Sequence, residues 1–159
     1  MSRALFALPL VTAFLMSAAT AQTAPAAAPT INPPAEVAAD PANRLTLELS
    51  NGGRVVILLR PDLAPAHVKR IQTLVSRGFY NGTAFHRVIP GFMAQGGDPT
   101  GSGQGGSDLP DLKAEFTSIP HLRGTVSAAR TADSRDSANS QFYIMFAPTV
   151  SLDNKYTVF

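Results

Sequence analysis

One unbroken stretch, residues 85–98, places a single cation among apolar and amide side chains. It reads FHRVIPGFMAQGGD, and its arginine is Arg87. A guanidinium is always charged and donates several hydrogen bonds from one plane. Placing it beside Ile89, Phe92 and Met93 costs solvation that a partner must offset. The stretch therefore predicts a site in which a fixed positive charge borders an apolar hollow.

This stretch resembles the best-known motif of the cyclophilin family of peptidyl-prolyl isomerases. Three more segments resemble the family in the same order and at similar spacing: GTVSAA at 124–129, NSQFYI at 139–144 and LDNKYTVF at 152–159. The resemblance begins near Arg44 and lasts to Phe159. It implies a mainly β fold, namely an eight-stranded antiparallel barrel capped by two helices. Family members continue beyond this point, so we expect the final strand and the second helix to be missing.

The resemblance also implies which residues form the site. Arg87 matches the catalytic arginine, and Gln95 matches the residue that hydrogen-bonds the substrate backbone. The positions that match the proline pocket are Phe92, Met93, Tyr143 and Leu152. Further substrate-binding positions implied by the resemblance are Ala129, Arg130, Gln141 and Tyr156. Proline-containing polypeptides are the implied partners, and no metal or cofactor is required.

Several of these positions depart from the better-known eukaryotic pattern. Ser151 stands where a tryptophan is usual, so weak binding of the inhibitor cyclosporin is expected. Tyr156 replaces a histidine, as in bacterial members, and Arg130 replaces an asparagine that binds mainly through its backbone. Tyr143 replaces a phenylalanine. Its extra hydroxyl needs a hydrogen-bond partner if the ring lines an apolar pocket.

The free energy that one hydrogen bond from Arg87 could contribute can be compared with the free energy that catalysis requires. Rotation about the bond before proline crosses a barrier of ~20 kcal/mol, because the nitrogen lone pair is delocalised into the carbonyl. A donor aimed at that nitrogen favours the twisted bond, in which the lone pair is localised. One charge-assisted hydrogen bond contributes roughly 1.5 to 3 kcal/mol, whereas a ~10⁵-fold acceleration needs about 7 kcal/mol. An apolar wall that excludes water must contribute as well.

The N-terminal residues predict export. Arg3 precedes an apolar run over 4–16, and ATA at 19–21 is a cleavage pattern, so residues 1–21 read as a signal peptide and not as a membrane anchor. The chain has no cysteine, which excludes lipid attachment at this boundary and disulfides. A periplasmic or secreted protein, not inserted in the membrane after cleavage, is expected. Residues 22–43 are rich in Ala and Pro and predict a disordered linker before a domain over 44–159.

Hydrophobic periodicity predicts the elements of that domain. Alternating Leu residues over 45–49 and the apolar run 55–59 flank the turn SNGG, which predicts a β-hairpin. Apolar residues at helical spacing over 68–75 predict an amphipathic helix that ends at Gly78. Further strands are predicted at 83–88, 92–95, 124–128, 141–146 and 157–159.

Charge and spacing argue against several other functions. The formal net charge is only +2, and Lys69-Arg70 is the one basic pair, so nucleic acid is not an expected partner. The segment GSGQGG at 101–106 matches a dinucleotide fingerprint but lacks its strand-and-helix context, and a flexible loop beside the substrate groove is expected instead. The three histidines, His67, His86 and His121, match no zinc pattern and are expected to be structural or solvated.

Three alternatives stay open at this point. Arg87 taken alone is more often a surface or structural ion pair, with Asp98 as the nearest candidate. A hydrolase using Ser127, Ser140 or His86 is a second alternative, although no GxSxG elbow occurs. The third is a non-catalytic module or chaperone that binds proline peptides on the same fold. A monomer is expected in each case.

Overall fold

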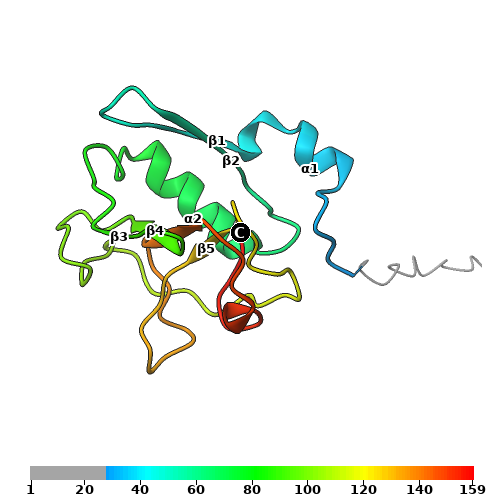
Figure 1. The fold of residues 1–159 in the computed structure, drawn as a ribbon. Coiled ribbons are helices and arrows are strands. Elements are labelled where there is room, and N and C mark those ends of the chain that lie inside the picture. The colour runs from blue at the N-terminus through cyan, green and yellow to red at the C-terminus, as the bar shows by residue number, and fades with distance from the viewer. Residues whose placement is uncertain (1–27) are drawn as a thin grey trace, which may run out of the picture.

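The computed structural model describes residues 28–159 (Figure 1). The chain begins there with short helical turns, continues into a β-hairpin and one long helix, and ends in a small sheet with long connections. In chain order the elements are α1 (Ala35–Ala39), η1 (Pro41–Asn43), β1 (Arg44–Glu48), β2 (Arg54–Leu58), α2 (Pro65–Ser76), β3 (Arg87–Ile89), β4 (Met93–Gly96), β5 (Val126–Ala128), β6 (Phe142–Met145) and η2 (Val150–Leu152).

The predicted hairpin is confirmed. β1 and β2 pair antiparallel, with Arg44 opposite Leu58 and Leu47 opposite Val55. The turn places Gly52 at φ +81°, a conformation that glycine adopts without steric cost. The sequence SNGG therefore fixes the register that the alternating leucines require.

The predicted helix is also confirmed as α2. Proline opens it, and its first turn lacks a side-chain cap from its own N-cap residue, Ala64. Glu115 supplies that cap from a distant loop, since its carboxylate accepts from the backbone N–H of Ala66 and of His67, both at 3.1 Å. It also bonds His67 Nδ1 at 2.6 Å. One carboxylate thus joins the start of α2 to the loop before β5.

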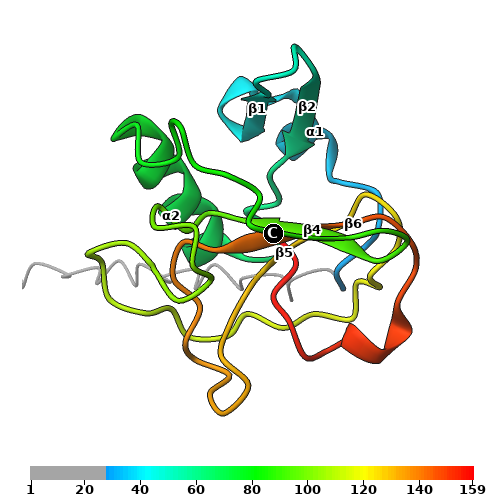
Figure 2. The same cartoon turned by 60° about the vertical axis from the view of Figure 1, so that its left-hand side comes forward.

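The four-stranded sheet carries the rest of the fold. Its order is β3-β4-β6-β5, and every pair is antiparallel. Figure 1 shows the hairpin on one side of α2 and this sheet on the other, and Figure 2 shows the hairpin standing away from the sheet. Side chains from all three parts meet in the main core, which includes Ile57, Leu59, Val68, Ile71, Val126 and Phe142.

The mainly β class is confirmed, but the strands of the described residues do not form the predicted barrel that lacks only its final strand. Their strands form two separate sheets, and the hairpin pairs with no strand of the other sheet. Residues 157–159 contribute one isolated bridge, between Ser127 and Val158, which is too short for a ladder. Of the strand predicted over 83–88 only Arg87 and Val88 belong to β3, because Phe85 turns inward against Phe142 at a ring distance of 6.2 Å.

The disordered linker predicted over 22–43 is wrong for its later part. α1 and η1 lie within it, and they are tied to the domain. Buried Asn43 donates from Nδ2 to the carbonyl of Val37 at 3.1 Å. Arg60 donates to the carbonyls of Thr30 and Ile31 at 2.8 and 2.9 Å. These polar anchors replace the large apolar residues that the segment lacks.

The predicted signal peptide and the first residues of the linker lie outside the described part of the chain. Within residues 28–159, no helix combines the length and the apolar composition needed to cross a membrane.

Candidate functional site

The structure gathers the predicted residues around one small cavity on the four-stranded sheet. Its volume is about 190 Å³. The cavity is lined by Arg87, Phe92, Met93, Gln95, Ala129, Arg130, Tyr143, Leu152 and Tyr156. Gln141, the other predicted binding residue, lies behind this lining. The segments that meet here span more than sixty positions of the sequence, which the sheet brings together.

Strand register places the key side chains in a row. Arg87 on β3 is the direct partner of Gln95 on β4, and Gln95 is the direct partner of Tyr143 on β6. Directly opposed residues point to the same face of a sheet. Arg87 is exposed, Gln95 half-buried and Tyr143 buried, so the row descends from solvent into the protein.

The floor of the cavity is apolar. Met93, Tyr143 and Met145 are 2%, 6% and 1% exposed and form one buried cluster. Phe92 and Leu152 pack against this cluster from either side. A hollow of this kind holds an apolar ring and excludes water, which strengthens any hydrogen bond made at its rim.

A chain of hydrogen bonds leads away from the arginine. Arg87 Nη1 donates to Gln95 Oε1 at 3.3 Å, and Gln95 Nε2 donates to Gln141 Oε1 at 2.9 Å. Gln141 Nε2 then donates to the carbonyls of Gly103 and Gly105 at 3.0 and 2.8 Å. Both amides are thereby oriented, with the oxygen of Gln95 turned toward the guanidinium. Gln141 acts on the site through Gln95.

The loop at the end of this chain is held by Asp98. Its carboxylate accepts from the backbone N–H of Thr100, Gly103 and Gly105 at 2.8, 2.7 and 3.1 Å. Burial raises the pKa of Asp98, but the hydrogen bonds from Thr100, Gly105 and Gly103 outweigh it and hold the pKa well below its usual value. The glycine-rich segment thus lies beside the site, as predicted, but in one closed conformation. No helix follows it, so it is not a dinucleotide site.

The ion pair between Arg87 and Asp98 that the sequence left open is not formed. Asp98 is fully buried and takes its hydrogen bonds from its own loop. Arg87 points to Gln95 and the cavity instead. Among residues 28–159 no carboxylate lies within ion-pair distance of Arg87.

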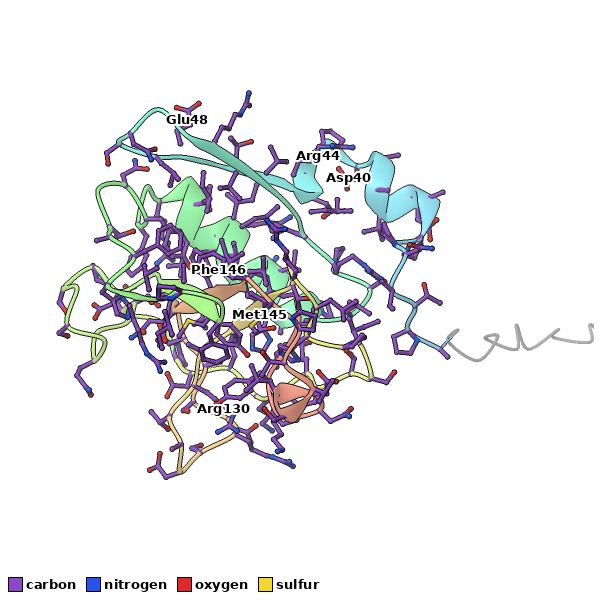
Figure 3. All side chains as sticks on the ribbon, in the orientation of Figure 1. Asp40, Arg44, Glu48, Arg130, Met145 and Phe146 are labelled. Carbon is purple, nitrogen blue, oxygen red and sulfur yellow. The ribbon has the colours of Figure 1, made fainter. Side chains whose placement is uncertain are left out.

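Arg130 closes the rim opposite Arg87. Its guanidinium carbon lies 4.6 Å from the centre of the Tyr156 ring. It also donates to the carbonyl of Lys155 at 2.9 Å and to that of Thr131 at 2.8 Å. Figure 3 shows Arg130 on the far side of the sheet from the hairpin, which is marked there by Arg44. The side chain of Arg130 is therefore held by Tyr156 and these two carbonyls, and it shapes the rim of the cavity.

A buried polar array lies under the floor, and the sequence reasoning missed it. Asp153 Oδ1 lies 2.9 Å from His121 Nδ1, and Ser127 Oγ lies 3.0 Å from His121 Nε2. The order of groups is that of a hydrolytic triad, but Ser127 is fully buried and no substrate carbonyl could reach it. Ser140, the other serine of the hydrolase alternative, is 1% exposed and donates to the carbonyl of Gly97, so neither serine can serve as its nucleophile. The available signal was Tyr143, whose hydroxyl needs a partner and finds His121 Nε2 at 3.3 Å.

A second and larger hollow, of about 900 Å³, lies between the hairpin and residues 80–85. It borders none of the predicted site residues. Within the described residues there is also no group of three or more His, Asp or Glu side chains placed to hold a metal ion.

The small cavity, with Arg87 at its rim and an apolar floor, has a counterpart in a known family. Residues 44–159 match the family described as "Cyclophilin type peptidyl-prolyl cis-trans isomerase/CLD". The chain belongs to this cyclophilin family. The match covers the whole domain predicted from the sequence.

Individual cyclophilins agree with this assignment. The chain is 52% identical to a "Probable peptidyl-prolyl cis-trans isomerase" of Brucella suis, over 76% of this chain and 66% of that protein. It is 38% identical to peptidyl-prolyl cis-trans isomerase B of Bacillus subtilis, over 70% of this chain and 77% of that one. The chain thus spans slightly less than two thirds of the Brucella protein's length.

Two cyclophilin crystal structures share the fold. AquaCyp293 from Hirschia baltica superposes with a TM-score of 0.67 at 32% identity, covering 75% of this chain and 63% of that one. A Cryptosporidium parvum cyclophilin, crystallised in the presence of the dipeptide Ala-Pro, gives a TM-score of 0.69 at 29% identity, covering 73% and 75%.

Proposed function

We propose that this cyclophilin is a peptidyl-prolyl cis-trans isomerase that accelerates rotation of X-Pro bonds in exported polypeptides. The observation that carries the proposal is the position of Arg87 at the rim of an apolar cavity whose floor is Met93 and Tyr143. The names of the Brucella and Bacillus relatives support it. So does the use of Ala-Pro with the Cryptosporidium protein, since such a dipeptide presents the ring that this cavity suits.

In the proposed mechanism the proline ring enters the cavity and lies on the apolar floor. As the bond twists, the prolyl nitrogen loses conjugation and its lone pair becomes available. Arg87 donates to that lone pair, an interaction absent from the planar ground state, so it lowers the barrier selectively. Gln95 binds the backbone of the peptide and keeps it in register. No covalent bond forms or breaks.

The size of the effect requires more than one residue. A hydrogen bond from Arg87 is worth roughly 1.5 to 3 kcal/mol. The oriented amides of Gln95 and Gln141 add pre-aligned dipoles, and the buried floor excludes water. We therefore assign catalysis to the cavity as a whole, with Arg87 as the catalytic residue.

Location and partners form part of the proposal. Residues 1–21 support export to the periplasm or medium, which would make newly exported, proline-containing chains the substrates. We also propose that the protein is a monomer and binds cyclosporin weakly, because Ser151 offers no indole at the rim. The mass of the exported protein tests the first point. Cleavage after Ala21 is expected, and a retained N-terminus would contradict it.

The central test is the exchange rate of an Ala-Pro peptide, measured by NMR line shape or by a protease-coupled assay. Arg87→Ala should lower the catalysed rate roughly 100-fold, in line with the loss of one transition-state donor. Arg54→Ala is the matched control, because Arg54 is exposed on β2 in the hairpin. Equal catalysed rates for Arg87→Ala and the unaltered protein would overturn the role of Arg87. An unaltered protein that binds the peptide but does not accelerate exchange above the uncatalysed rate would overturn catalysis and indicate a non-catalytic module that binds proline peptides.

A further inference from the structure

The buried array under the floor connects two walls of the cavity. Asp153 Oδ1 accepts from the backbone N–H of His121 at 2.8 Å and lies 2.9 Å from Nδ1 of its ring. Asp153 directly follows Leu152, which lines the cavity. On the other side of the ring, His121 Nε2 lies 3.3 Å from the hydroxyl of Tyr143. The ring of His121 is buried, at 1% exposure, whereas the Asp153 side chain is 23% exposed.

Counting donors fixes the direction of the array. An ionised carboxylate can only accept, so His121 donates its Nδ1 proton to Asp153. In the neutral ring, Nε2 then carries one lone pair and accepts from a hydroxyl. Ser127 Oγ lies 3.0 Å and the hydroxyl of Tyr143 lies 3.3 Å from Nε2, so both hydroxyls are within hydrogen-bond distance of this acceptor. The hydroxyl of Tyr143 therefore contacts the array, while its ring lines the cavity.

We propose that His121 and Asp153 are positioning residues for proline recognition, acting through the hydroxyl of Tyr143. This inference rests on the proposed function, since it concerns the same cavity. A phenylalanine ring at position 143 would be held by packing alone, whereas Tyr143 is also held at its far end. The ring stacks on His121 at 6.2 Å and meets the edge of Tyr156 at 5.6 Å, so its tilt sets the shape of the floor.

The pKa of Tyr143 is consistent with this role. Burial raises it well above its ordinary value of 10.0. The hydroxyl therefore stays protonated and remains a donor over the whole physiological range.

The test measures the Kd of an Ala-Pro peptide by NMR titration of the full chain, together with the exchange rate. Tyr143→Phe should raise Kd about three- to ten-fold, because it removes one hydrogen bond at the floor. Asp153→Ala should raise Kd by a similar factor, because it frees the ring of His121. Asp153→Asn should restore most of the affinity, since an amide oxygen accepts the same two N–H groups.

The decisive variant combines two changes. If Asp153 acts through the Tyr143 hydroxyl, then Asp153→Ala adds nothing further to Kd in a Tyr143→Phe background. Multiplying effects would overturn the proposal, as would an unchanged Kd in Tyr143→Phe. Tyr80→Phe is the matched control: it removes the hydroxyl of a half-buried tyrosine, bonded to the carbonyl of Ser140 at 3.0 Å, away from the cavity. It should leave Kd unchanged.

Measuring peptide binding and turnover separately distinguishes failure of the positioning role from failure of the proposed isomerase activity. A chain that binds the peptide with the expected pattern of Kd values, yet does not accelerate exchange, would overturn isomerase activity and support the positioning role. Normal turnover together with no coupling between the substitutions at residues 153 and 143 would support isomerase activity and overturn the positioning role. Failure of the unaltered chain to bind the peptide at all would overturn both.

Discussion

Arg87 and Gln95 are direct partners across the β3–β4 pair, and their side chains meet at 3.3 Å on the face that carries the cavity. The guanidinium is exposed, so packing alone does not hold it. The hydrogen bond to Gln95 holds the guanidinium in place, and the Gln95 side chain is in turn oriented by its 2.9 Å hydrogen bond to Gln141. The position of the Arg87 guanidinium at the cavity therefore depends on two neutral amides.

Replacing the first of these amides should impair turnover. In Gln95→Leu, Arg87 loses its acceptor and the peptide loses a backbone contact, so kcat/KM for an Ala-Pro peptide should fall roughly 10- to 100-fold, as expected for a hydrogen bond to a charged group. Gln72→Leu is the matched control, because Gln72 donates a comparable bond to the carbonyl of Ala42 from α2. An unchanged kcat/KM in Gln95→Leu would show that Arg87 needs no such support.

Glycine 97 should prove far more sensitive to substitution than other glycines of the same conformation. Gly97 and Gly82 have φ of +88° and +73°. A methyl group at Gly97 would clash with the carbonyl oxygen of Ser140, whereas at Gly82 it would meet nothing within 4 Å. Gly82→Ala should cost about 1 kcal/mol of unfolding free energy, and Gly97→Ala about 3 kcal/mol or more. Urea denaturation gives both values, and equal costs would contradict the prediction.

The cap that Glu115 places on α2 should be measurable as stability. Glu115→Gln removes the charge that accepts from Ala66 and His67, so it should lower the unfolding free energy by about 1 kcal/mol. Denaturation in urea at neutral pH tests this. Glu48→Gln, on the exposed end of β1, should change stability little. A loss of the same size in both variants would mean that net charge, and not capping, is responsible.

Stability should fall in acid, and Asp98 should account for part of the fall. Its pKa in the folded protein is lowered from a usual value of 3.8, so the unfolded chain takes up the proton first. The stabilisation is complete above about pH 4 to 5 and is lost as the pH falls through and below that range. Urea midpoints between pH 3 and pH 6 should therefore decrease with acidity. Asp98→Asn should flatten this decrease, and an unchanged slope would contradict the assignment.

Local patterns in the sequence predicted local structure well. Alternating leucines around SNGG predicted β1 and β2, and helical spacing over 68–75 predicted α2. The resemblance in four segments also predicted which side chains would share a cavity, and nine of them line it. These predictions succeeded because they rest on residues that are close in sequence or on motifs that have a characteristic local geometry.

What could not be predicted depends on contacts between distant segments. Arg60 reaches back to Thr30 and Ile31, so a segment with a linker's composition becomes part of the fold. Closure of the barrel depends on pairing between strands far apart, which no local pattern reports. His121 and Asp153 were missed for the same reason, since only the folded chain shows that their partners are each other and Tyr143.

The chain of hydrogen bonds from Arg87 through Gln95 to Gln141 affects how long a bound peptide stays. The side chains of Gln95 and Gln141 already have hydrogen-bond partners, so a peptide that binds Gln95 exchanges one partner for another and gains little net free energy from doing so. Selection then falls to the five-membered ring, and the residues around it are tolerated broadly. We expect brief binding of many unrelated proline-containing sequences, which suits the proposed isomerase activity.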